Sequence, residues 1–128
     1  MPSEGKPQPI DTVAIATPDD VPATDLWLLT DRRERHMASF AGQATADASA
    51  ADALAALALG VVIRRKLDDQ EQRLVLEGRR RGATWEQLAG SLNAAEPAQV
   101  RSAFMAWAQQ LPEGEAAEAL HYVGNGTD

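Results

Sequence analysis

The chain has 128 residues, which suits one compact domain, and it contains no internal repeat that would indicate an array. It has no cysteine, which excludes disulfides, thiolate metal sites and a cysteine nucleophile, and we expect a cytoplasmic location. The formal net charge of −7 argues against general phosphate binding, although residues 60–111 hold eight Lys and Arg against six Asp and Glu.

No targeting or membrane segment is expected from the sequence. The first residues have neither a basic flank nor an apolar run, unlike a secretory signal. The longest apolar run, residues 53–63, is about half the length that crosses a bilayer. We therefore predict no membrane partner.

Residues 1–23 are predicted to form a disordered tail. Helix-breaking residues recur along this segment, which contains Pro2, Gly5, Pro7, Pro9, Pro18 and Pro22. Such a segment buries too little apolar surface to offset its chain entropy.

Residues 24–112 are predicted to form one helical domain, beginning with a short amphipathic helix from Leu26. Trp27, Leu28 and Phe40 are its expected core anchors. Residues 42–48 are interpreted as a loop. Ser49, with Asp52 three residues on, has the pattern of a capping box that starts the next helix.

That next helix is predicted to be central to the domain. Leu54, Leu57 and Val61 share one face by their spacing and should form a buried stripe. Further apolar residues widen the stripe beyond what one small core covers, and a homodimer could bury the side made by Leu59, Val62 and Ile63.

The second half is predicted to contain three more helical segments. Apolar spacing continues to about Arg81, with residues 68–69 either capping a new helix or lying within a continuous one. Gly82 and Asn93 are expected helix ends, because both residue types tolerate left-handed backbone. Helix starts are predicted at Thr84, paired with Gln87, and at Pro97. Pro112 is expected to end that helix, residues 113–123 to form a short acidic helix, and residues 124–128 to fray.

The pattern predicts an all-α fold: a small helical bundle whose C-terminal half, about residues 70–111, is a trihelical unit. Its core residues share apolar helical spacing and are expected to be Trp85, Leu88, Ala89, Leu92, Val100, Phe104 and Trp107.

Residues 79–92, with the sequence RRRGATWEQLAGSL, resemble a recurring element of small actinobacterial helix-turn-helix proteins. That element is related in shape to the promoter-binding region 4 of sigma factors. The resemblance covers about forty residues, from roughly Gln70 to Leu111. One departure is the turn, since Asn93 stands where the usual members have glycine, and the turn is one residue longer.

The resemblance implies a recognition helix that starts at Pro97 and binds double-stranded DNA. The residues then expected to contact bases or phosphates are Arg79, Arg80, Arg81, Gln99, Arg101 and Ser102. The three consecutive arginines have a second explanation, because cations are favoured at a helix C-terminus whether or not DNA is bound.

Two functions follow from the sequence. The first is a DNA-binding or nucleoprotein-associated regulator, and the second is a protein-interaction or oligomerisation module with a degenerate helix-turn-helix fold. Catalysis and cofactors are not expected: His36 and His121 lack metal-ligand spacing, and the acidic pairs at 68–69 and 113/115 have the pattern of solvated surface.

Overall fold

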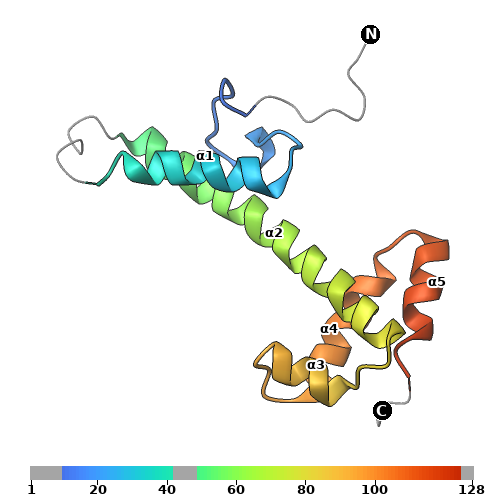
Figure 1. The fold of residues 1–128 in the computed structure, drawn as a ribbon. Helices are drawn as coiled ribbons and strands as arrows, with labels where there is room; N and C mark the ends of the chain where they lie inside the picture. The colour runs from blue at the N-terminus through green and yellow to red at the C-terminus, as the bar shows by residue number, and fades with distance from the viewer. Residues whose placement is uncertain (1–9, 42–48, 125–128) are drawn as a thin grey trace. The chain divides into compact units, whose positions relative to one another are not determined.

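The computed structural model describes residues 10–41 and 49–124. Every regular element in this part of the chain is helical, which confirms the all-α prediction (Figure 1). The elements are η1 (Pro18–Asp20), α1 (Leu26–Ala38), α2 (Ala50–Arg80), α3 (Trp85–Ser91), α4 (Pro97–Gln109) and α5 (Glu113–His121). None of the helices described is both long and apolar enough to cross a membrane.

The chain divides into two compact units, Met1–Leu67 and Asp68–Asp128, which we call unit 1 and unit 2. The helical domain predicted over residues 24–112 spans parts of both units. Each unit buries its own set of apolar side chains. Helix α2 contributes its first part to unit 1 and its last part to unit 2, and it is continuous through residues 68–69.

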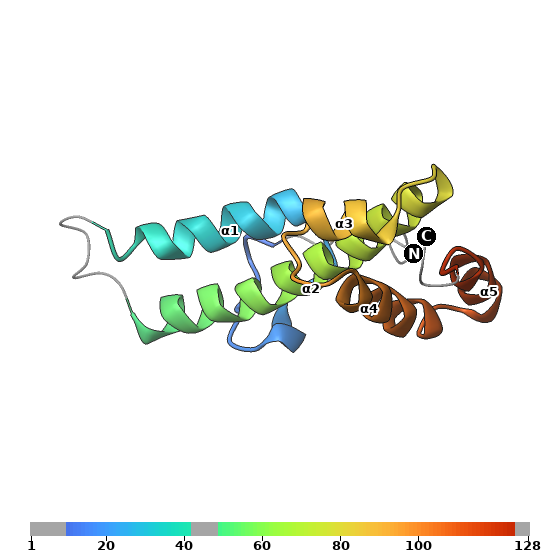
Figure 2. The same ribbon diagram turned by 90° about the horizontal axis from the view of Figure 1, so that it is seen from below.

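Unit 1 is built on α1 and the first part of α2, which lie side by side (Figures 1 and 2). Helix α1 begins after Asp25, whose carboxylate accepts a hydrogen bond from the Leu28 amide at 2.9 Å. The buried core consists of Ile10, Ile15, Leu29, Ala55, Ala58 and Leu59. Ala55 and Ala58 of α2 lie in this cluster together with Leu29 of α1.

The faces that α1 and α2 bury differ from those predicted. Trp27 is 72% exposed and Leu57 68%, and Leu54 and Phe40 are also exposed, so these expected core anchors are not in the core. Leu28 is partly buried against the core, as Val62 and Ile63 are. Because residues 53–63 are apolar on almost every side, spacing alone does not identify the buried face, and the structure buries the face with Ala55, Ala58 and Leu59.

The side of α2 that a homodimer was expected to bury packs within unit 1. Leu59 is fully buried there, and Val62 and Ile63 pack against the same cluster. That expected dimer surface is therefore wrong. The predicted loop at residues 42–48 lies outside the described residues.

Part of the predicted disordered tail is packed. Ile10 and Ile15 are 3% and 6% exposed, and Thr17 begins the η1 turn, in which Asp20 accepts hydrogen bonds from the Ala16 and Thr17 amides at 3.0 and 2.9 Å. These two amides hold the pKa of the Asp20 carboxyl below its ordinary value. Residues 10–23 of the predicted tail thus contact unit 1, because the isoleucines that lie between the prolines are buried in its core. Residues 1–9 lie outside the described residues.

Unit 2 follows the predicted order of helices closely. Gly82 ends α2 with φ of 94°, and Asn93 follows α3 with φ of 54°, both in left-handed conformation. Thr84 and Gln87 form the predicted capping box at the start of α3, and Pro97 lies in the first turn of α4. Helix α5 ends at His121, and residues 125–128 of the expected frayed end lie outside the described residues.

The core of unit 2 contains most of the residues predicted for it. Its buried members are Val75, Leu76, Trp85, Ala89, Val100, Phe104, Ala108, Ala119 and Val123. Leu88 and Trp107 are partly buried against it. Leu92, predicted as core, is 37% exposed, because it caps the end of α3 and turns toward the surface with the chain.

Candidate functional site

Arg79, expected at a DNA interface, is bound inside unit 2. Its Nε donates to the carbonyl of Tyr122 at 2.8 Å, and its Nη1 donates to the carbonyl of Ala83 at 2.9 Å. Its guanidinium carbon lies 4.7 Å from the ring centroid of Trp85, within cation–π range. Arg79 therefore joins the end of α2 to the segment that follows α5.

The other two arginines of the cluster are ion-paired. Arg80 contacts Glu118 on α5 and also pairs with Glu77 through its Nη1 at 2.5 Å. Arg81 lies 3.4 Å from the other carboxylate oxygen of Glu77, and its side chain is 72% exposed. Of these two, Arg81 has the more exposed side chain and is the easier one for a phosphate to reach.

The residues expected on the recognition face of α4 also have internal roles. The Gln99 side chain accepts a hydrogen bond from the Glu96 amide at 3.2 Å and so caps α4. Arg101 donates from Nη2 to the carbonyl of Gly124 at 3.1 Å. Ser102 is exposed, and its exposed neighbours Ala98 and Ala106 carry neither charge nor polar side-chain atoms.

Three of the six predicted residues, Arg79, Arg80 and Arg101, thus contact α5 or the residues that follow it, and the six do not form one basic face. Arg79 and Arg101 both bind carbonyls of residues 122–124, while Arg80 binds α5 itself. Charge-assisted hydrogen bonds of this kind stabilise a fold, and they leave fewer donors for a nucleic acid.

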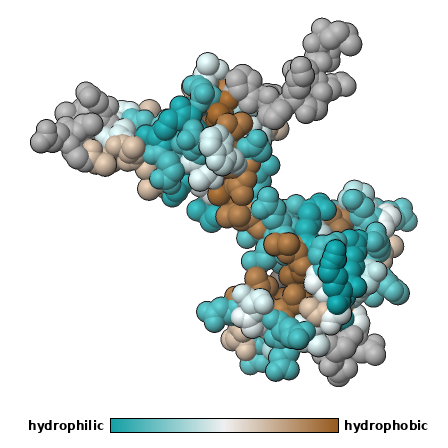
Figure 3. All heavy atoms as spheres, viewed as in Figure 1, coloured by the Kyte–Doolittle hydropathy of each residue, from teal (hydrophilic) through white to brown (hydrophobic). Residues whose placement is uncertain are grey.

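A groove of about 320 Å³ lies between α2, α4 and α5 within unit 2. We call it the α2–α4–α5 groove, and its lining residues are Arg73, Leu76, Glu77, Arg80, Trp107, Leu111, Glu115 and Glu118. Leu76, Trp107 and Leu111 supply its apolar surface, and charged side chains surround them. Figure 3 shows hydrophobic residues among hydrophilic ones on the visible face of unit 2.

Trp107 is held in place in this groove by two polar contacts. Its indole Nε1 donates to Asp69 Oδ1 at 2.9 Å, and the Arg73 guanidinium carbon lies 5.4 Å from its ring centroid. Asp69 also accepts from Arg73 Nε at 2.9 Å, and this hydrogen bond raises the pKa of Arg73. A half-buried aromatic with a fixed orientation is a common anchor at protein interfaces.

Sequence reasoning missed most of this groove. Trp107 was predicted, but only as core, and Glu115 was taken as solvated surface. One signal was available, because Asp69 and Arg73 have the i, i+4 spacing that favours an ion pair on a helix. The approach of Glu118 to Arg80 is a tertiary contact, which no local spacing indicates.

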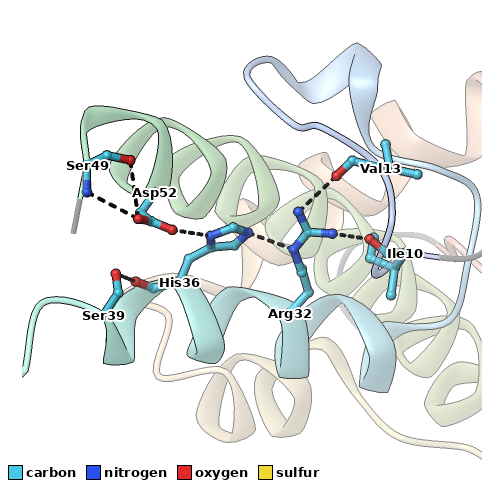
Figure 4. Close-up of polar contacts among 7 residues, drawn as sticks. All are labelled: Ile10, Val13, Arg32, His36, Ser39, Ser49 and Asp52. Atoms are coloured by element: carbon cyan, nitrogen blue, oxygen red, sulfur yellow. Dashed lines mark hydrogen bonds and ion pairs between the residues drawn. The ribbon is translucent and has the colours of Figure 1, made fainter. Parts of the chain in front are cut away.

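Unit 1 contains a separate chain of polar contacts that links α1 to α2 (Figure 4). Arg32 Nε lies 2.7 Å from His36 Nε2, and His36 Nδ1 lies 2.9 Å from Asp52 Oδ1. The contact with His36, followed by the Ser49 amide, holds the pKa of the Asp52 carboxyl below its ordinary value. His36, predicted as a surface residue, has a side chain only 17% exposed.

Comparison of the chain with models of protein families, with curated protein sequences and with solved structures finds no match. Among the residues that the structure describes, no group of three or more His, Cys, Asp or Glu side chains could hold a metal ion.

Proposed function

We propose that the chain is a non-enzymatic protein-interaction module whose α2–α4–α5 groove receives an apolar side chain of a partner protein. The observation that carries this proposal is the groove itself, whose lining combines a hydrogen-bonded, half-buried Trp107 with two leucines and several charged side chains. A volume of about 320 Å³ accommodates one large apolar side chain with part of its flanking backbone.

The charges on the rim favour a basic partner. Arg73 and Arg80 already have carboxylate partners in Asp69, Glu77 and Glu118, whereas Glu115 adds a further negative charge beside them. The whole chain carries a net charge of −7. Electrostatic complementarity therefore points to an amphipathic segment with an apolar anchor and flanking Lys or Arg.

DNA binding is the second candidate, and the order of helices favours it. The end of α2, the capped α3 and the Pro97-initiated α4 follow each other as in the helix-turn-helix proteins that residues 79–92 resemble. The ion pairs of Arg80 and the part-buried hydrogen bonds of Arg79 weigh against it, since affinity for DNA rests largely on cations that can bind phosphates.

An NMR titration with a synthetic amphipathic peptide tests the proposal. The probe is a helical peptide of about 14 residues with leucines on one face and lysines on the other. The control peptide has glutamate in place of each lysine. We expect the lysine peptide to shift the indole Nε1–H signal of Trp107 and to leave that of the exposed Trp27 unchanged. The glutamate peptide should shift neither signal.

Two matched charge reversals locate the binding. Glu115→Lys, on the rim, should weaken binding of the lysine peptide by about five- to tenfold, while Glu86→Lys, an exposed position on α3 outside the groove, should change it little. Equal effects of both substitutions, or no shift at Trp107, would refute docking in the groove.

A titration with DNA distinguishes the two candidate functions. A mixed-sequence duplex of about 20 base pairs should cause no salt-sensitive change in the α4 amides, even near 50 mM salt, where phosphate contacts are strongest. Salt-sensitive binding that shifts the α4 amides, and that Arg81→Ala weakens, would favour DNA over a protein partner.

A further inference from the structure

Arg32 holds the segment of residues 10–15, which we call the strap, against unit 1. Its Nη1 donates to the carbonyl of Ile10, and its Nη2 donates to the carbonyl of Val13 at 2.9 Å. Arg32 is only 9% exposed, and Ile10 and Ile15 of the strap are buried in one cluster with Leu29. The guanidinium therefore satisfies backbone carbonyls of the strap, which has no regular secondary structure.

The third donor of Arg32 determines the protonation state of His36. An arginine Nε carries a hydrogen and can only donate, so His36 Nε2, at 2.7 Å, must be the acceptor. The imidazole in this arrangement is neutral, with its hydrogen on Nδ1. That hydrogen is donated to Asp52 Oδ1 at 2.9 Å, so both ring nitrogens have defined partners.

We propose that His36 is a proton-operated switch that holds the strap through Arg32 when it is neutral and releases it when it is protonated. A proton on Nε2 would place an N–H opposite the N–H of Arg32, and one cation opposite another. The imidazolium keeps its Nδ1 bond to Asp52, so Arg32 is the partner that must withdraw. When Arg32 moves, its bonds to the carbonyls of Ile10 and Val13 are lost with it.

The charged groups around His36 come from α1, α2 and the strap. On α1, Arg33 and Arg35 neighbour His36, and on α2 Asp52 faces it, bonded also to the Ser49 amide at 3.2 Å. On the strap, Asp11 pairs with Arg35, and this contact holds the pKa of the Asp11 carboxyl below its ordinary value. Asp11 and Asp52 thus stay charged down to about pH 5, so neither carboxylate can act as the switch.

Cysteine reactivity measures the release directly, because the natural chain has no cysteine. Ile15→Cys places a thiol at a buried position of the strap, and Ala14→Cys places one at its exposed neighbour. The ratio of their reaction rates with a disulfide reagent cancels the pH dependence of the thiol itself. We expect this ratio to rise by about tenfold between about pH 7.5 and 5.5.

Two histidine variants identify the group. His36→Gln keeps an acceptor for Arg32 but does not titrate, so the ratio should become independent of pH. His121→Gln alters the exposed histidine of α5 and should leave the pH dependence intact. A ratio that does not change with pH in the parent, or that still changes in His36→Gln, would overturn the proposal.

A second measurement needs no substitution in the strap. Nitrogen-15 NMR of the imidazole distinguishes the protonated nitrogen from the acceptor. We expect hydrogen on Nδ1 of His36 at about pH 7.5, and hydrogens on both nitrogens at about pH 5.5. Hydrogen on Nε2 at the higher pH would contradict the arrangement on which the switch depends.

Discussion

The indole of Trp85 combines deep burial with a directed hydrogen bond. The residue is 2% exposed, and its Nε1 donates to the carbonyl of Val123 at 2.8 Å. Its ring lies 5.7 Å from that of Phe104 by centroids, and the Arg79 guanidinium covers it. A single side chain therefore connects α3, α4, the end of α2 and the segment after α5.

Replacing Trp85 with alanine should lower the free energy of unfolding of unit 2 by about 3–5 kcal/mol, the range for a buried aromatic. Trp27→Ala is the matched control: this residue is 72% exposed, and the change should be within about 0.5 kcal/mol. Urea unfolding followed by circular dichroism measures both. A loss below about 1 kcal/mol for Trp85→Ala would contradict the packing described.

The sequence predicted which residues of unit 2 are apolar anchors, but not what its arginines do. Trp85, Val100 and Phe104 follow helical spacing with polar residues between them, so periodicity identifies them as core. The charge of Arg79 and Arg101 does not indicate whether these side chains bind phosphates or backbone carbonyls. Their partners, Tyr122 and Gly124, are 43 and 23 residues away, and no local pattern indicates such contacts.

At the scale of elements, the end of α2 and helix α3 approach closely at Gly78. A Cβ built on Gly78 would lie 3.0 Å from Leu88 Cδ2 and 3.6 Å from Ala83 Cβ. Gly90, within α3, has nothing within 4 Å of the same position. The two glycines therefore differ in what an added methyl group would meet.

Gly90→Ala should raise the free energy of unfolding by about 0.5–1 kcal/mol, because alanine loses less conformational entropy in a helix. Gly78→Ala gains the same helical preference but forces Leu88 to move, so we expect it to be less stable than Gly90→Ala by about 1 kcal/mol or more. Thermal unfolding compares the pair. Equal stabilisation by both substitutions would show that the helices are not in close contact at Gly78.

Element boundaries in unit 2 were predictable because they depend on local chemistry. Thr84, Gln87, Gly82 and Pro97 act through their own backbone or through residues three positions away. The buried face of α2 in unit 1 was not predictable in the same way. The leucine face and the alanine face are both apolar there, and which of them is buried depends on the contacts with the rest of unit 1.

At the scale of the whole molecule, the two cores lie in different units. Leu29→Ala should lower the free energy of unfolding by about 3 kcal/mol and should speed amide exchange mainly in unit 1. Phe104→Ala should speed amide exchange mainly in unit 2. Both residues are fully buried, so the two truncations are comparable. Hydrogen exchange followed by NMR resolves the units. Equal loss of protection throughout the chain in both variants would indicate one cooperative core.

The division into units was not available from the sequence. A length of 128 residues favours one domain, and no helix-breaking residue separates residues 64–80 from the first part of α2. Whether one long helix serves one core or two depends on which side chains meet in space.

The contacts of residues 122–124 also limit how far the protein can be trimmed. Three carbonyls in a row accept bonds from Arg79, Trp85 and Arg101, and Val123 itself is buried. A truncation that stops after Gly124 keeps all three acceptors. One that stops before Tyr122 would leave an indole and two guanidiniums without them, so minimal versions for crystallisation or fusion should retain residue 124.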